Sequence, residues 1–237
     1  MSEQSPNNPT QQISTVRKMS AGNGLAARLQ NLPQVIVDVT KLTNRIALIF
    51  DDSGSMYGEP FSKAKQGVEA WLQCLNPNDT AVEIIPLEGK VHEFTNNMVM
   101  LNGYVQRLSI QGNTPIFKCL KLVLDTKVAN RIILFSDGAP TDDLEYDDET
   151  YLKEAKLPKY CAQFKAAGIP IDTCFIGRDT KNAANFMREL AEGTDGIFLH
   201  FTGPETFKAG LKYLSPGKRH LLANAELKAK IQRGEEI

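Results

Sequence analysis

Short apolar runs that alternate with longer amphipathic segments constrain the fold of this chain more than any other feature of its sequence. Runs that are almost continuously apolar are typical of strands buried on both faces of a parallel sheet. Five are present: RIALIF (45–50), AVEIIPL (81–87), RIILFS (131–136), IDTCFIG (171–177) and GIFLHF (196–201). Between them, helical spacing of apolar residues predicts covering helices. These residues are Phe61, Ala64, Val68, Trp71, Leu72 and Leu75, then Ile116, Leu120, Val123 and Leu124, then Phe207, Leu211 and Leu214.

A sixth strand, KVHEFT (90–95), follows the second after only Glu88 and Gly89. Such a short connection favours a β-hairpin, so this strand is expected to be an antiparallel edge strand. Doubly wound sheets of this kind commonly have the strand order 3-2-1-4-5-6, in which strands one and four are neighbours. Ligands bind beyond the carboxyl ends of these two strands. We therefore predict an α/β fold with a doubly wound, mostly parallel six-stranded sheet and helices on both faces. The strands to inspect are the first and the fourth.

The chain has 237 residues, which suits one such domain with an extension at each end. We predict a polar, partly disordered N-terminal extension over residues 1–43, because its first part is rich in Ser, Asn, Gln and Pro. Its last part, from residue 25, suits a short helix followed by a strand or a packed arm. The domain itself is expected over residues 44–214. Residues 215–237 form a charged extension, either a solvated or frayed helix with one apolar stripe (Leu221, Leu222, Ala225 and Ile231) or a docking element for a partner.

Composition excludes several classes of protein. A formal net charge of −1 gives no global field that favours nucleic acid or a membrane surface. The longest apolar runs fall far short of the roughly 20 residues that cross a bilayer, and the N-terminus does not resemble a secretory signal. We therefore expect a soluble, cytoplasmic protein. The scattered cysteines and histidines lack the paired spacing of a zinc site, and the cysteines resemble small buried hydrophobes; they are Cys74, Cys119, Cys161 and Cys174 with His92, His200 and His220.

Five residues with side-chain oxygens follow the first and fourth strands or lie just before a predicted helix. The sequence DDSGSM after the first strand supplies Asp51, Ser53 and Ser55, and DGAPTDD after the fourth strand begins with Asp137. Thr114 lies in GNTP, just before a helix expected to begin at Pro115. Hard oxygen ligands of this kind suit Mg²⁺, Mn²⁺ or Ca²⁺. Two carboxylates only balance the charge of a divalent ion, so waters or an acidic side chain of a partner must complete its coordination.

At these positions the sequence resembles the von Willebrand factor A family, whose metal-ion-dependent adhesion site combines DxSxS with a distal Thr and a distal Asp. The resemblance covers about residues 44–214, and all five positions are present in the family's order. It implies that the chain binds a partner protein through an Asp or Glu that coordinates the metal, preferably Mg²⁺. Ser53, Ser55 and Thr114 would be hydroxyl ligands, with Asp51 and Asp137 acting directly or through water. Analogy with small family members suggests a scaffold beside an AAA+ ATPase or in a stress or defence complex.

Other interpretations stay open at this stage. Asp51, Ser53 and Thr114 are each suited to capping a helix, and Asp137 with Gly138 to an ordinary turn. The metal is also compatible with a purely structural role. Asp52 is expected to point away from the site as a solvated or turn-stabilising residue. An enzyme is not expected: position 53 is Ser where an aspartyl-phosphate phosphatase needs a second acid, and no GxSxG supports a hydrolase using Ser53 with His200 and Asp195. An acidic run is expected to be a solvated loop; if it is functional, attraction of a basic patch on the partner is favoured over help in binding a second cation. The run comprises Asp142, Asp143, Glu145, Asp147, Asp148 and Glu149.

Overall fold

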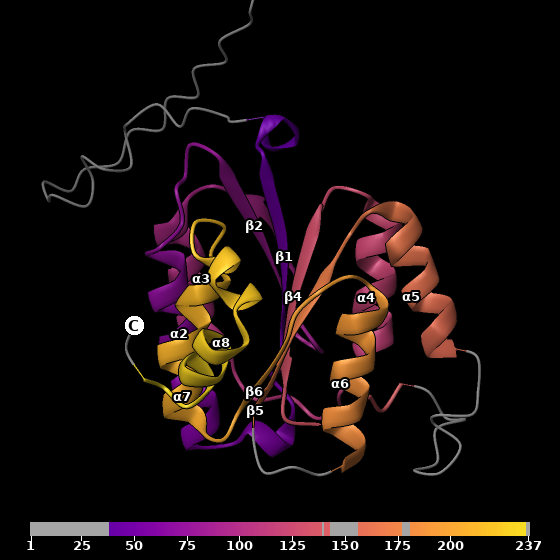
Figure 1. Ribbon diagram of the computed structural model, residues 1–237. Helices are drawn as coiled ribbons and strands as arrows, with labels where there is room; N and C mark the ends of the chain where they lie inside the picture. Colours follow the sequence, from indigo (N-terminus) through magenta and orange to yellow (C-terminus); the bar gives the residue numbers. More distant parts are fainter. Residues whose placement is uncertain (1–37, 139, 143–155, 177–180, 236–237) are drawn as a thin grey trace, which may run out of the picture. The chain divides into compact units, whose positions relative to one another are not determined.

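A computed structural model of the chain describes residues 38–138, 140–142, 156–176 and 181–235. At its centre is a six-stranded sheet of order β3-β2-β1-β4-β5-β6 (Figure 1). The strands are β1 (Asn44–Phe50), β2 (Thr80–Pro86), β3 (His92–Thr95), β4 (Arg131–Ser136), β5 (Ile171–Ile176) and β6 (Phe198–Phe201). β3 pairs with β2 in the antiparallel sense, and the other neighbours are parallel. The predicted fold class, strand order and antiparallel edge strand are confirmed.

Helices cover both faces of the sheet (Figure 1). One face carries α2 (Glu59–Leu72), α3 (Met98–Arg107), α7 (Pro204–Gly210) and α8 (Ala225–Gln232). The other carries α4 (Ile116–Thr126), α5 (Lys156–Ala167) and α6 (Lys181–Gly193). Short 3-10 helices complete the described chain: η1 (Val39–Lys41), η2 (Gly54–Met56), η3 (Leu211–Leu214) and η4 (Arg219–Ala223).

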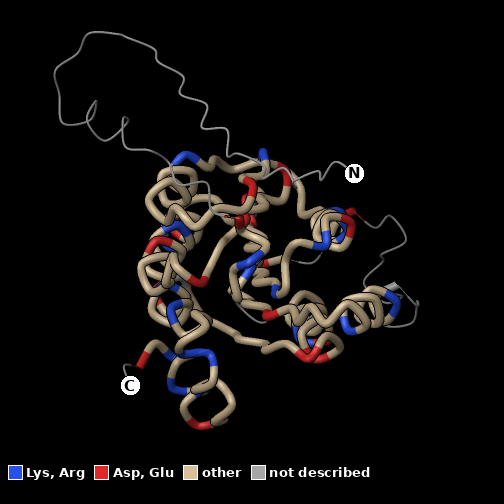
Figure 2. The backbone as a smooth tube through the Cα atoms, turned by 90° about the horizontal axis from the view of Figure 1, so that it is seen from above, with Lys and Arg blue, Asp and Glu red and all other residues tan. Residues whose placement is uncertain are grey.

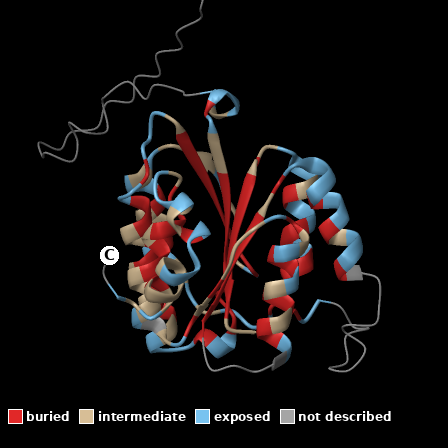
Figure 3. Cartoon of the chain, viewed as in Figure 1, coloured by how far each residue is buried: buried red, intermediate tan, exposed pale blue. Residues whose placement is uncertain are grey.

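Two apolar layers, one on each side of the sheet, explain why the strands are continuously apolar. In β1, Ile46, Leu48 and Phe50 pack into the first layer, whereas Ala47 and Ile49 pack into the second. Successive side chains of a strand point to opposite faces, so a strand covered by helices on both sides has no solvent-facing positions. Figure 3 shows the buried residues concentrated in the strands and on the inward sides of the helices.

Some boundaries and helices differ from the sequence-based prediction. β6 begins at Phe198 and β3 at His92, each two residues later than predicted. Helices α3, α5 and α6 are absent from that prediction. In α3 the interior Asn102–Gly103 is typical of a turn, but Leu101 and Val105 are buried in the core that α2 also enters. Tertiary packing of this apolar face therefore overrides a weak local preference.

The C-terminal segment contributes to the core. The expected single apolar stripe is split between η4 and α8, because Asn224 caps α8 by accepting hydrogen bonds from the backbone amides of the two residues after Ala225. Leu222 and Ile231 are buried with the core residues of the first face, whereas Ala225 is exposed. Arg219 of η4 also donates to the buried carboxylate of Asp172 at 2.9 and 2.7 Å.

Asp172 also accepts hydrogen bonds from the buried guanidinium of Arg131, at 2.8 Å from Nε, and from the backbone amide of Ile197 at 2.8 Å. Burial alone would raise the pKa of the Asp172 carboxyl, but the two Arg partners hold it below its usual value. This ion cluster joins the beginnings of β4 and β5 to the segment that follows η3. It lies at the edge of the sheet opposite the carboxyl ends of these strands.

The described part of the chain has mixed surface charge and mostly buried cysteines. Lys and Arg residues intermingle with Asp and Glu around the helices in Figure 2. No described helix combines the length and apolar character needed to cross a membrane. Cys119, Cys161 and Cys174 are buried as predicted, but Cys74 is exposed. Burial raises the pKa of Cys119 to about 12, which makes its thiol unreactive at neutral pH.

Candidate metal-binding site

Asp51 lies immediately beyond β1, at the carboxyl edge of the sheet. Because Phe50 pairs with Phe135 in the β1–β4 register, the next residues of the two strands, Asp51 and Ser136, lie opposite each other. The Ser136 hydroxyl donates to Oδ2 of Asp51, and the Ser53 amide donates to Oδ1 at 2.8 Å. Asp51 is fully buried. Strand pairing therefore fixes this carboxylate at the junction of the two central strands.

A chain of hydroxyls connects the β1 loop to the residue after β4. The Oγ atoms of Ser53 and Ser55 lie 3.0 Å apart, and Ser55 Oγ donates to Oδ1 of Asp137 at 2.7 Å. Ser53 is extended and η2 begins at Gly54, and the turn brings the two serine hydroxyls together, with that of Ser55 against Asp137. Four of the five predicted site residues are thus connected by a chain of three hydrogen bonds that runs from Asp51 to Asp137.

Thr114, the fifth predicted residue, lies on the loop that precedes α4. Its backbone amide donates to Oγ1 of Thr141 at 2.9 Å, and the Thr141 amide donates back to its carbonyl at 2.9 Å. A methyl group placed on Gly138 would lie 3.9 Å from the Thr114 hydroxyl and 4.0 Å from the Ser136 hydroxyl. The structure therefore brings the Thr114 hydroxyl beside the residue that follows Asp137.

The alternative capping roles do not match the helix starts. The N-cap of α2 is Gly58, so neither Asp51 nor Ser53 caps that helix. Ser53 is the N-cap of the 3-10 turn η2 but makes no side-chain capping hydrogen bond. Pro115 is itself the N-cap of α4, not its first helical residue as expected, so Thr114 does not cap it.

Burial raises the pKa of both site carboxyls. For Asp51, burial outweighs the hydrogen bonds from Ser136 and Ser53, which favour the charged form. For Asp137, burial is again the largest cause, and the neighbouring charge of Asp51 raises its pKa further. Two carboxylates held together in a partly desolvated site repel each other, and a divalent cation would offset that repulsion. The donor set therefore fits the cation that the resemblance implies.

Neutral oxygens are essential to this candidate site. Within the described ranges, no group of three or more His, Cys, Asp and Glu side chains is arranged to hold a metal ion. A cation bound between Asp51 and Asp137 would rely on the hydroxyls of Ser53, Ser55 and Thr114 for its other protein ligands. Such a shell suits Mg²⁺, Mn²⁺ or Ca²⁺ and does not suit soft metals.

Ser136 and Asp52 differ from the sequence-based expectations, and Asp142 of the acidic run makes a hydrogen bond to a neighbouring helix. Ser136 was not recognised, although its position before Asp137 at the end of a buried strand is the available clue. Asp52 stabilises the neighbouring loop as expected, since its Oδ1 accepts from the Glu88 amide at 3.2 Å, but it is fully buried and not solvated. Asp142 accepts from the Lys118 amide at 2.7 Å, and the rest of the acidic run, residues 143–149, lies outside the described residues.

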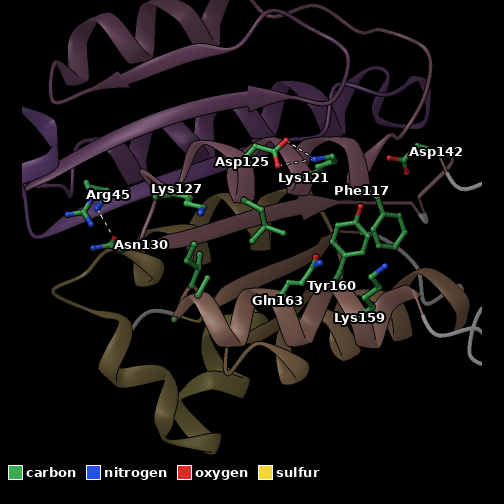
Figure 4. A pocket seen from close by; sticks show the side chains of 15 residues that line it. Arg45, Phe117, Lys121, Asp125, Lys127, Asn130, Asp142, Lys159, Tyr160 and Gln163 are labelled. Carbon is green, nitrogen blue, oxygen red and sulfur yellow. Dashed lines mark hydrogen bonds and ion pairs between the residues drawn. The ribbon is translucent and has the colours of Figure 1, made fainter.

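The sheet order separates the residues of the alternative hydrolase. His200 lies on β6, and β4 and β5 stand between β6 and the β1 strand that precedes Ser53. Asp195 forms an ion pair with Lys165 at 3.0 Å. A groove of about 940 Å³ is found elsewhere, between α4 and α5, where Phe117 and Tyr160 lie among several charged side chains (Figure 4). Its lining contains none of the five predicted metal ligands.

Comparison with solved structures shows that the chain has a von Willebrand factor A-type fold. The structure of a von Willebrand factor type A protein from Catenulispora acidiphila aligns with a TM-score of 0.59 and 19% identity, over 81% of this chain and 43% of that one. BatB from Bacteroides thetaiotaomicron, described as a conserved hypothetical protein, aligns with a TM-score of 0.51 and 16% identity, over 79% and 99%.

Proximal thread matrix protein 1 from the mussel byssus aligns with a TM-score of 0.55 and 14% identity, over 79% of this chain and 46% of that one. The chain thus spans less than half the length of two of these three proteins. No protein-family model and no curated protein sequence matches it. At these identities the likeness defines the fold, and the site must be argued from its own residues.

Proposed function

We propose that this chain is a protein-binding module that holds a divalent cation, preferably Mg²⁺, at the carboxyl edge of its sheet. The ligands are the five residues Asp51, Ser53, Ser55, Thr114 and Asp137. The observation that carries the proposal is the hydrogen-bonded path from Asp51 through Ser53 and Ser55 to Asp137, whose last bond joins residues 82 positions apart in the sequence.

The composition of this ligand set supports binding of an acidic residue from a partner protein. Two protein carboxylates only neutralise a divalent cation, so the bound ion can still attract a further negative oxygen. A bound Mg²⁺ supplies a coordination position for that oxygen, and Ser55 Oγ lies in an exposed residue at the surface of the site. We propose recognition without turnover, because the carboxylate beside the Ser55 hydroxyl, that of Asp137, would itself be engaged by the cation and would not serve as a general base.

The cellular setting is a separate part of the proposal. By analogy with small members of the family that the sequence resembles, we propose a cytoplasmic adaptor or scaffold. Its partner would be an AAA+ ATPase or a component of a stress or defence complex. The metal-dependent contact itself does not depend on which of these partners is involved.

The decisive experiment compares partner capture with and without cation. The immobilised full chain is incubated with extract of its native host in Mg²⁺ or in EDTA, and bound proteins are identified by mass spectrometry. Affinity for the purified partner is then measured for the wild type and for a double variant, Ser53→Ala with Ser55→Ala. The exposed Ser62 of α2 supplies the matched control, Ser62→Ala.

We expect binding in Mg²⁺ that is lost in EDTA and in the double variant but retained in Ser62→Ala. The double variant should stay folded, because it removes two small hydroxyls at the edge of the sheet and leaves both apolar layers intact. Substituting one Asp or Glu of the partner should abolish binding as well. If neither EDTA nor the double variant changes the affinity, the metal has a purely structural role and the adhesion hypothesis is wrong.

A further inference from the structure

The loop that carries Thr114 has no regular secondary structure of its own. Residues 108–115 lie between α3 and α4 and form neither helix nor strand. A hydroxyl that is to serve as a metal ligand must nevertheless be held in place before the ion binds, because ordering a loop on binding costs conformational entropy. Contacts from outside the loop must therefore position it.

Glu88, on the turn between β2 and β3, supplies the most extensive of these contacts. Its Oε2 accepts hydrogen bonds from the backbone amides of Gly112 and Asn113, both at 3.1 Å. Its Oε1 accepts a third from Nδ2 of Asn113 at 3.1 Å. One carboxylate thus holds two consecutive backbone amides directly before Thr114. These hydrogen bonds hold the pKa of Glu88 below its usual value, so it is charged at neutral pH.

Glu88 is itself fixed to the first metal-binding loop. Its backbone amide donates to Oδ1 of Asp52 at 3.2 Å, and the preceding amide, of Leu87, donates to the Phe50 carbonyl at 3.1 Å. The Asp52 carbonyl accepts from the Gln111 amide at 2.6 Å. The buried Asp52 and the exposed Glu88 therefore connect the loop after β1 to the loop before α4.

We infer that Glu88 is a positioning residue of the metal site, whose carboxylate holds the Gly112–Asn113 backbone so that the Thr114 hydroxyl faces the cation. The inference rests on the proposed function, since it assigns Thr114 a ligand role. Glu88 does not touch the cation. It acts through the loop, as residues that orient metal ligands commonly do, and their substitution lowers metal affinity by about 10- to 100-fold.

The test measures Mn²⁺ binding to the full chain by isothermal titration calorimetry. Glu88→Ala removes all three hydrogen bonds, and Glu88→Gln keeps the side-chain length with one acceptor oxygen. Glu59→Gln is the control for loss of a nearby negative charge, because Glu59 is exposed in the first turn of α2, close in sequence to the site serines. Hydrogen exchange of the Gly112 and Asn113 amides, measured in EDTA, reports loop order without any metal.

We expect Glu88→Ala to weaken Mn²⁺ binding by about tenfold and to speed exchange of the two amides, with Glu88→Gln intermediate and Glu59→Gln within about twofold of the wild type. The melting temperature in EDTA should change little, because Glu88 is exposed and outside the core. Equal Mn²⁺ affinity in the wild type and both Glu88 variants would overturn the positioning role while leaving the metal site intact. Absence of Mn²⁺ binding to the wild type would instead refute the proposed function, and this inference with it.

Discussion

Replacing Asp51 with Asn separates the charge of this carboxylate from its hydrogen bonds. The amide oxygen of Asn can still accept from the Ser53 amide, as Oδ1 does at 2.8 Å. Its NH₂ group can donate to Ser136 Oγ, which then donates to the Gly138 carbonyl 3.3 Å away. The variant therefore keeps the local network and removes one of the two charges that a cation would need.

Without cation, the variant is expected to be at least as stable as the wild type at pH 7. Burial raises the folded-state pKa of Asp51 above its ordinary value of 3.8. A raised pKa contributes stability below the unfolded value, and that contribution is lost as the pH rises through the folded value. Ionisation of the buried Asp51 carboxyl is therefore unfavourable in the folded state, and the neutral amide of the Asp51→Asn variant avoids that cost.

With Mg²⁺ the wild type is expected to become more stable than the Asp51→Asn variant. An ion bound only to the folded wild type at ten times its dissociation constant stabilises it by about 1.4 kcal/mol. For a chain of this size that corresponds to roughly 3–6 °C in melting temperature. Asp51→Asn should gain less than about 1 °C under the same conditions, because one carboxylate and neutral oxygens bind Mg²⁺ weakly.

Differential scanning calorimetry of both proteins in EDTA and in MgCl₂ measures the two effects, with NaCl at matched ionic strength as the control for screening. Equal Mg²⁺-dependent shifts in wild type and variant would show that the ion acts elsewhere. If Asp51→Asn were much less stable than the wild type in EDTA, the Asp51 charge would support the fold, contrary to the direction inferred from its burial.

Three further predictions concern stability. Burial raises the pKa of Glu83 on β2 from 4.5 to about 7, so its contribution is present below pH 4.5 and lost as the pH rises through 7. In urea unfolding, the free energy of unfolding should therefore fall less for Glu83→Gln than for the wild type when the pH is raised from about 5 to about 8. Equal falls in the two proteins would contradict this. Asp172→Ala leaves the buried Arg131 without its carboxylate and should cost about 3–5 kcal/mol in the same assay, whereas a cost below about 1 kcal/mol would refute the pairing. Ile231→Ala should cost about 2–5 kcal/mol, because Ile231 is buried in the core; a surface-like loss near 0.5 kcal/mol would show that the C-terminal segment does not pack there.

Much of the architecture could be predicted from the sequence because it depends on local patterns. The buried strands are continuously apolar, and the two-residue connection before KVHEFT favours a hairpin. Parallel strands with helical crossovers then leave few topologies, since the crossovers are right-handed. The five candidate ligands could be placed at one edge for the same reason: Asp51 and Asp137 each directly follow a strand, and the two strands are neighbours.

Helix α3 and the C-terminal segment illustrate what local patterns miss. The Asn102–Gly103 pair within α3 has a low helix preference, and only packing in the core shared with α2 compensates for it. Residues 215–237 are rich in charge, so the burial of two apolar residues among them could not be inferred from composition. Leu222 and Ile231 are buried because they meet apolar residues from distant strands, and Arg219 meets Asp172 across 47 positions of sequence.

The sequence by itself determined the sheet, its order and the identity of the candidate ligands, because each ligand follows a recognisable strand or, for Thr114, precedes a predicted helix. The tertiary structure alone decided how buried Asp51 is, that Ser136 donates to it, and that Glu88 and Asp52 hold the loop of Thr114. These features depend on contacts between residues 24 to 85 positions apart. No short-range pattern specifies such pairs, because hydrogen-bond geometry and desolvation are set only when the loops meet at the edge of the folded sheet.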